Sequence, residues 1–168
     1  MAMIHDPEVW QQKLAALPLQ HFEAGHTIFA EGTKTGKLLI LKSGAVAVSK
    51  HGIEIARVAD PGAIFGELSA LLDQPHGADV RTLEPSELHV TDAAHLLADP
   101  AALLYVTMIL ARRLDAANHG LHALKSQLEA GEPAGLVEQT IDRIEGFLSA
   151  IGGGYLRAGA GYSGYPFA

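Results

Sequence analysis

Short β-rich runs separated by glycine fill residues 19–91, and this rhythm constrains the fold more than any other feature of the chain. Runs of β-branched and aliphatic residues bounded by turn residues are typical of strands. Many short strands at regular spacing are typical of barrels and jelly-roll sandwiches. We therefore expect a mainly β fold, an antiparallel β-roll of jelly-roll type, with a hairpin turn at residues 49–52. The predicted strands cover residues 26–29, 37–41, 45–49, 53–58, 78–83 and 87–91.

A short helix is predicted to interrupt the strands at residues 67–72. It follows a tight turn at residues 65–68, and a second turn at residues 75–78 leads into the next strand. Glycine allows a ligand to approach the backbone closely, and the free N–H groups at a helix start attract phosphate. The Glu67 carboxylate can accept hydrogen bonds from a sugar hydroxyl. This layout predicts an anion pocket; the alternative is a plain strand-to-helix connection in which Glu67 only caps the helix. The candidate ligand-binding residues are Phe65, Gly66, Glu67, Leu68, Pro75, His76, Gly77 and Ala78.

Helices are predicted on both sides of the strands. Asp6-Pro7-Glu8 supplies an N-cap, a first-position proline and an early acid, so a helix is expected from there to about residue 16. Residues 92–98 predict a short helix, and Asp99-Pro100 predicts the start of a long one that reaches about residue 128.

A seam of mostly leucine residues runs along this long helix. Its members alternate at spacings of four and three, which is the a/d pattern of a coiled coil. We expect its first half to pack on the β-roll and its second half to meet a second copy, giving a homodimer through residues 100–128. The alternative is a seam packed within one chain by the last helix. The seam consists of Leu103, Thr107, Leu110, Leu114, Ala117, Leu121, Leu124 and Leu128.

Three segments are expected along the chain. Residues 1–130 form the folded domain with its long helix, residues 131–151 an additional amphipathic helix, and residues 152–168 a tail rich in glycine and tyrosine. Such a composition predicts a mobile tail. The alternative is that its aromatic side chains bind a partner.

The stretch of residues 62–81 resembles the phosphate-binding cassette of the cyclic nucleotide-binding domain, as found in catabolite-activator-type regulators. That family usually reads Phe-Gly-Glu-Leu, a short helix, then Pro-Arg-Ser/Ala-Ala. The stretch Ala111-Arg112-Arg113-Leu114 is similar to part of the family's dimer helix. The resemblance covers about residues 7–128. It implies a β-roll with an N-terminal helix and a long C-terminal dimerisation helix, cyclic AMP or cyclic GMP as ligand, and no cofactor.

Two parts of the implied site depart from the family pattern. His76 stands where the family has the arginine that neutralises the cyclic phosphate. Because a neutral imidazole lacks a permanent charge and a planar fork, binding is expected to be weaker by about 1.5–3 kcal/mol, or about ten- to a hundredfold. The family's adenine-contacting threonine–serine pair is replaced by Ala117 and Asn118, of which Asn118 still offers a hydrogen bond to a base. Arg112 and Arg113 could be phosphate ligands, but solvated positions on an exposed helix face are the preferred interpretation.

Composition excludes several classes of function. The net charge of −7 gives no general attraction to nucleic acid, and the residues after Leu128 predict no helix-turn-helix, so no DNA binding is expected. The absence of cysteine excludes disulfides, thiol catalysis and thiolate metal sites. No signal peptide is recognised, and the longest apolar stretch, residues 101–111, is too short to span a bilayer. A cytoplasmic protein without a membrane partner is expected.

Neither an enzyme nor a metal site is expected. His119 and His122 could share a metal on one helix face, but a third ligand is missing, and surface histidines are the preferred interpretation. Glu67 as a general base would lack a neighbouring nucleophile or second acid. Two functions stay open. One is a sensor in which a bound nucleotide reorients the long helix; the other is a ligand-independent dimerisation and interaction module.

Overall fold

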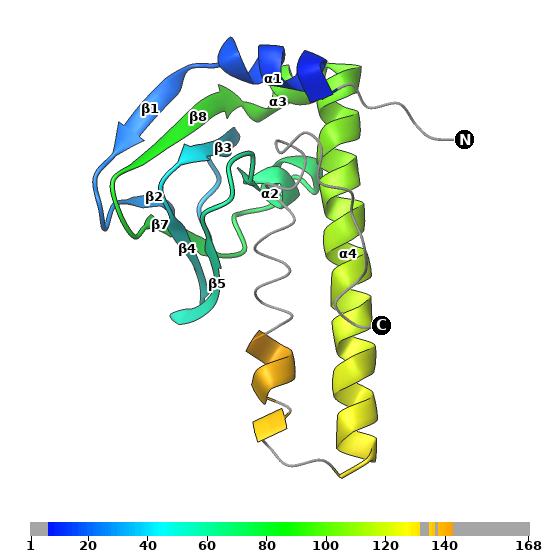
Figure 1. Ribbon diagram of the computed structural model, residues 1–168. Coiled ribbons are helices and arrows are strands. Elements are labelled where there is room, and N and C mark those ends of the chain that lie inside the picture. The colour runs from blue at the N-terminus through cyan, green and yellow to red at the C-terminus, as the bar shows by residue number, and fades with distance from the viewer. Residues whose placement is uncertain (1–6, 132–134, 137, 143–168) are drawn as a thin grey trace.

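The computed structural model describes residues 7–131, 135–136 and 138–142, which form a β-roll with a long helix at its side (Figure 1). Helix α2 lies between the roll and the long helix α4, and α1 and α3 lie near the N-terminal end of α4. The elements in chain order are α1 (Pro7–Ala15), β1 (Leu19–Phe22), β2 (Thr27–Phe29), β3 (Lys37–Ser43), β4 (Val46–Lys50), β5 (Ile53–Val58), β6 (Ile64–Phe65), α2 (Glu67–Leu71), β7 (Asp79–Thr82), β8 (Ser86–Asp92), α3 (Ala93–Leu97) and α4 (Pro100–Glu129).

The strands form two four-stranded sheets of order β1-β8-β3-β6 and β2-β7-β4-β5. Every strand pair is antiparallel, so the predicted antiparallel β-roll is confirmed, and so is the short helix that interrupts it. The hairpin between β4 and β5 is also confirmed: Lys50 pairs with Ile53, and His51 and Gly52 have φ angles of 51° and 78°. Positive φ at both central residues is what a two-residue type I′ turn requires.

Strand β3 divides the core into two clusters. Because side chains alternate along a strand, Leu38 and Ile40 pack with the helices, whereas Leu39 and Leu41 face the interior of the roll. All four side chains are buried. The helical cluster includes Trp10 of α1, whose ring stacks on Tyr105 of α4 with centroids 4.2 Å apart. This strand therefore joins the roll to its helices.

Helix α4 begins as predicted, with the Asp99 side chain accepting hydrogen bonds from the backbone N–H groups of Ala101 and Ala102. It packs against the rest of the domain through Ala102, Tyr105, Val106 and Ile109. The expectation that the first half of the leucine seam packs on the rest of the domain holds only for Leu110, which is half-buried against the helical cluster. Leu103, Thr107 and Leu114 are exposed, because the helix presents the adjacent stripe, with its larger aromatic and β-branched residues, to the core.

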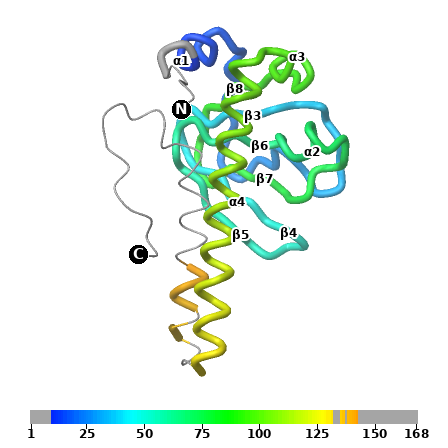
Figure 2. Tube along the Cα trace, turned by 90° about the vertical axis from the view of Figure 1, so that its right-hand side faces the viewer, coloured from blue at the N-terminus to red at the C-terminus, as the bar shows by residue number. Residues whose placement is uncertain are grey.

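The C-terminal half of α4 extends beyond the β-roll (Figure 2). Along it Leu114, Leu121 and Leu128 are 63%, 66% and 63% exposed. Residues 135–136 and 138–142, which lie within the helix predicted for residues 131–151, are helical. The remainder of that prediction, and the tail of residues 152–168, lie outside the described residues. No helix in the described part of the chain is long and apolar enough to cross a membrane.

Candidate functional site

Gly66 connects β6 to α2 in a conformation that only glycine adopts without strain. Its φ angle is 91°, in the left-handed region. A Cβ atom at this position would lie 2.6 Å from the carbonyl oxygen of Lys37 and 2.9 Å from the ring of Phe29. The sequence therefore places glycine where two strands and a helix start meet. As the N-cap of α2, Gly66 supplies no side-chain acceptor to the first N–H groups of the helix.

Glu67 opens α2 and is buried, with 5% of its surface exposed. Its Oε1 accepts a hydrogen bond of 2.7 Å from Nη1 of Arg113 on α4, and Nη2 of Arg113 donates to the carbonyl oxygen of Ile64 at 3.2 Å. Burial raises the pKa of the Glu67 carboxyl, and the Arg113 guanidinium opposes this rise. The cassette and the long helix are thus joined by one ion pair in a largely water-excluded place.

Arg113 is the site residue that the sequence interpretation missed. It was expected on an exposed helix face, and this is wrong: only 24% of its side chain is exposed, because it reaches across to α2. The signal was present in Ala111-Arg112-Arg113-Leu114, the stretch similar to the family's helix. A local pattern could not show which of the two arginines faces the cassette.

His76 is held by the loop between β2 and β3. Its ring stacks on Phe29 with centroids 4.0 Å apart, and its Nε2 lies 2.9 Å from the hydroxyl of Thr35. Its backbone N–H donates to the carbonyl of Thr33, and its carbonyl accepts from the N–H of Gly32. Only 5% of the residue is exposed, and burial lowers the pKa of the imidazole. Burial therefore favours the neutral form of the ring.

Phe29 brings the two predicted turns together, because its ring contacts His76 on one side and approaches Gly66. Phe65 is buried, whereas Leu68, Pro75 and Gly77 are exposed and Ala78 is half-buried. Asn118 is exposed on α4, slightly more than one turn beyond Arg113. Within the described ranges, the structure groups no three His, Cys, Asp or Glu side chains in a way that could hold a metal ion.

Comparison with known proteins identifies the class of domain that this geometry belongs to. The family model "Cyclic nucleotide-binding domain" matches residues 19–98, and this part of the chain belongs to that family. A cGMP-dependent protein kinase of Eimeria tenella is 42% identical over 71 residues, which are 42% of this chain and 7% of the kinase. A CRP-like cAMP-activated global transcriptional regulator of Mycobacterium tuberculosis is 28% identical over 140 residues, which are 79% of this chain and 61% of the regulator.

The fold is also that of a solved regulator. The structure of the Thermus thermophilus catabolite activator protein superposes with a TM-score of 0.58 at 24% identity, covering 85% of this chain and 82% of that one. At this identity the likeness shows the fold alone. The chain spans less than two thirds of the length of the curated relatives named above.

Proposed function

We propose that this chain is a regulatory domain that binds a cyclic nucleotide or a related anion and transmits the binding event through α4. Residues 1–130 form this domain, with residues 131–151 as an added helix and residues 152–168 as a tail. The match to the cyclic nucleotide-binding domain family supports the ligand class, as do relatives named for cAMP and cGMP.

The observation that carries the proposal is the Glu67–Arg113 ion pair. Glu67 lies at the ligand cassette, and Arg113 lies on the helix that leaves the domain. A ligand hydroxyl that donates to Glu67 would change the hydrogen bonding between Glu67 and Arg113. Because Arg113 lies on α4, ligand binding at the cassette and the position of α4 would then be linked. Such a link requires the ligand to have different affinities for two positions of α4.

Cyclic AMP is expected to bind weakly at pH 8 and more tightly at pH 6. Burial lowers the pKa of His76 in the free protein, whereas a bound phosphate would raise it. The ring then takes up a proton on binding, so lowering the pH favours the complex. Titration calorimetry with cyclic AMP and cyclic GMP at the two pH values measures the effect.

Two substitutions test whether His76 contacts the phosphate of the ligand. His76→Arg is expected to tighten binding about ten- to a hundredfold by restoring a permanent charge. His76→Gln keeps a hydrogen-bonding side chain but cannot titrate, so its binding should not depend on pH. Tight binding at pH 8 that survives His76→Gln would contradict the assigned role of His76.

The second candidate function is a ligand-independent interaction module. One observation favours it: the His76 ring is buried, stacked on Phe29, and hydrogen-bonded to Thr35, so its Nε2 already has a partner within the protein. In this interpretation the histidine is a structural replacement for the family arginine. Absence of binding heat at both pH values, and again after His76→Arg, would favour the module over the sensor.

Both candidate functions include homodimerisation through α4. Leu114, Leu121 and Leu128 of the seam are exposed in the single chain, whereas Leu124 is half-buried. The a/d spacing of the seam fits a parallel partner helix. Leu121→Glu is expected to shift the mass measured by light scattering from dimer to monomer, since it places a charge in the seam. Ser126→Glu adds the same charge at an exposed position outside the seam and should leave the dimer intact. Monomer mass for the unaltered protein would overturn the dimer.

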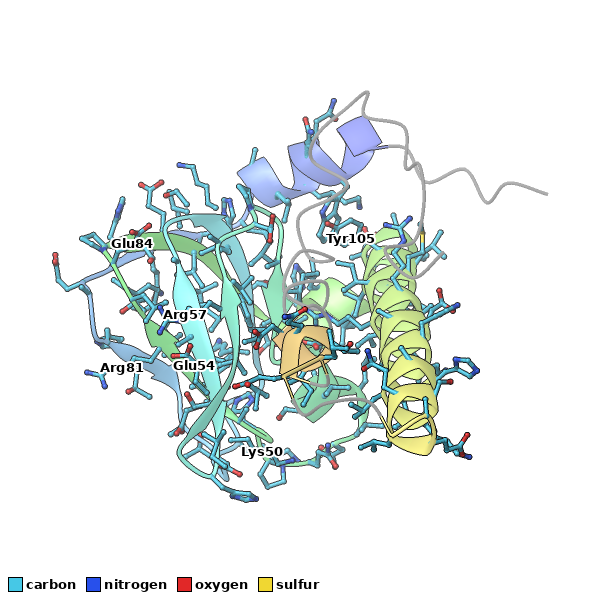
Figure 3. All side chains as sticks on the ribbon, turned by 60° about the horizontal axis from the view of Figure 1, so that its bottom comes forward. Lys50, Glu54, Arg57, Arg81, Glu84 and Tyr105 are labelled. Atoms are coloured by element: carbon cyan, nitrogen blue, oxygen red, sulfur yellow. The ribbon has the colours of Figure 1, made fainter. Side chains whose placement is uncertain are left out.

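The proposal includes neither a catalytic step nor contact with DNA by this chain. Charged side chains of both signs are mixed on the side of the roll remote from α4, where Figure 3 shows them. The labelled ones are Lys50, Glu54, Arg57, Arg81 and Glu84. A mixed surface of this kind does not provide the basic patch that a nucleic-acid backbone requires.

A further inference from the structure

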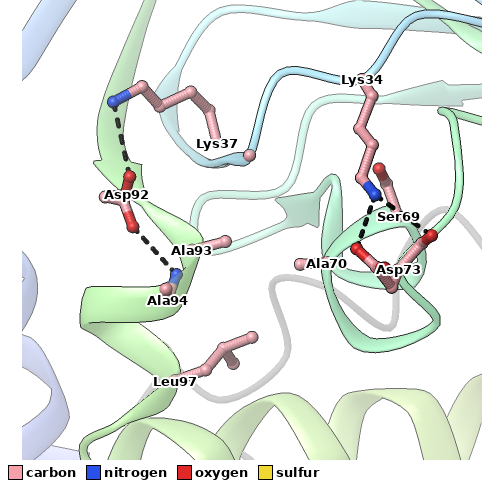
Figure 4. A pocket seen from close by; sticks show the side chains of 10 residues that line it. Lys34, Lys37, Ser69, Ala70, Asp73, Asp92, Ala93, Ala94 and Leu97 are labelled. Atoms are coloured by element: carbon pink, nitrogen blue, oxygen red, sulfur yellow. Dashed lines mark hydrogen bonds and ion pairs between the residues drawn. The ribbon is translucent and has the colours of Figure 1, made fainter.

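A cavity of about 270 Å³ lies between the β2–β3 loop, α2 and α3 (Figure 4). None of its lining residues belongs to the candidate ligand-binding residues of the cassette. Its volume is close to the lower end for small-molecule sites, about 300 Å³. The lining residues are Lys34, Gly36, Lys37, Ser69, Ala70, Asp73, Asp92, Ala93, Ala94 and Leu97.

Two ion pairs, each formed by one lysine and one aspartate, face each other across this cavity, and their nitrogen–oxygen distances differ. Lys34 donates to the Asp73 carboxylate at 2.5 Å and to its backbone carbonyl at 3.2 Å, so its ammonium is well satisfied. Lys37 lies 3.9 Å from Oδ2 of Asp92, which is too long for a hydrogen bond. The other oxygen of Asp92, Oδ1, accepts from the backbone N–H of Ala94 and caps α3.

The cavity floor between the two pairs is apolar. Ala70 and Ala93 lie in the middle of the view in Figure 4, and Leu97 lies below them. The hydroxyl of Ser69 already donates to the carbonyl of Gln74. The two lysines and two aspartates sum to no net charge, so the cavity favours neither a simple anion nor a simple cation. A molecule with both charges and a short aliphatic part matches all three features.

We propose that this cavity is a binding site for a small aliphatic zwitterion, such as a free amino acid. The carboxylate of the ligand binds the ammonium of Lys37, and the ammonium of the ligand binds Oδ2 of Asp92. The ligand thus binds both members of the pair that is too far apart to share a hydrogen bond. Its side chain packs on Ala70 and Leu97. The cavity shares Ser69, Ala70 and Asp73 with the cassette stretch of residues 62–81 but none of its candidate ligand-binding residues. The proposal therefore does not depend on cyclic nucleotide binding.

The probe is L-leucine, which is titrated into the full chain. Calorimetry measures the heat of binding, and NMR measures the chemical shifts of the protein's backbone amides. The expected dissociation constant is on the order of 0.1–1 mM, with shifts concentrated at the amides of Ala70, Ala93 and Ala94. Lys37→Met should weaken binding at least about tenfold, since it removes one charge-assisted contact. The matched control is Lys42→Met: Lys42 lies on the same strand, is also 49% exposed, and also pairs with an acid on β8.

Three outcomes would overturn the proposal. The first is no saturable heat and no shift at these amides at leucine concentrations on the order of 10 mM. The second is equally tight binding of N-acetyl-L-leucinamide, which lacks both charges and would make the cavity a plain apolar groove. The third is an equal loss in Lys37→Met and Lys42→Met. Because the chemical shifts are measured on the unaltered protein, a folding defect in a variant leaves the test intact.

Discussion

Replacing Gly66 with alanine is expected to cost about 2–5 kcal/mol of unfolding free energy. A left-handed conformation costs a residue with a Cβ about 1–2 kcal/mol. The new methyl group would also lie 2.6 Å from the Lys37 carbonyl oxygen, which is backbone of a central strand and cannot move aside cheaply. Overpacking of this kind adds about 1–3 kcal/mol. Urea denaturation of the two proteins measures the difference.

Gly52→Ala is the matched control. Gly52 also has a positive φ, 78°, but a Cβ there meets nothing within 4 Å. Only the conformational cost of about 1–2 kcal/mol remains. If both alanine variants lose the same free energy, the close approach of β3 to the cassette is not what selects glycine at position 66.

The sequence predicted the order of elements well because local signals determined them. The short runs around Lys37 and Ile53 are bounded by turn residues, and Asp92 and Asp99 have the side chains that cap α3 and α4. Strands β1 and β6 were not predicted. Strand β6 is two residues long, Ile64–Phe65, so it cannot show an alternating pattern and forms only because β3 offers it a partner.

The candidate site was predictable to the extent that it lies within one stretch of chain. The cassette residues were identified from the resemblance, and the structure places Glu67 and His76 in buried surroundings. Their partners come from distant segments: Arg113 for Glu67, and Phe29 and Thr35 for His76. No spacing rule along the sequence encodes such contacts. The lowered pKa of His76 likewise follows from burial, which a residue type alone does not give.

The leucine seam illustrates the same distinction. Its spacing correctly indicated a helix with an apolar stripe, but spacing cannot say what covers the stripe. Tyr105 and Ile109 face the core instead, so most of the seam is left on the outside of the single chain, while Leu110 and Leu124 are half-buried. The leucine seam was expected to be partly buried within the chain, but its exposed leucines are the surface on which the dimer proposal rests.

Arg113→Leu is expected to destabilise the domain by about 3 kcal/mol at pH 8, because it leaves the buried Glu67 carboxylate without its countercharge. The loss should shrink toward pH 5. Burial already raises the pKa of Glu67, and removing the guanidinium raises it further. A carboxyl whose pKa is higher in the folded than in the unfolded state contributes stability at low pH, and this contribution is lost as the pH rises.

The double variant Glu67→Gln/Arg113→Leu tests the cause. With no charge left to bury, it should be more stable at pH 8 than Arg113→Leu alone, and its stability should lose the extra pH dependence. Arg57→Leu breaks the solvent-exposed pair with Glu54 and should change little, since exposed pairs contribute little to stability. Urea denaturation of the four proteins at pH 5 and pH 8 measures both effects. A loss in Arg113→Leu that is the same at both pH values, and is not relieved by Glu67→Gln, would show that Arg113 acts by packing its side chain and not by neutralising Glu67. The link between the cassette and α4 would then have to be sought in another contact.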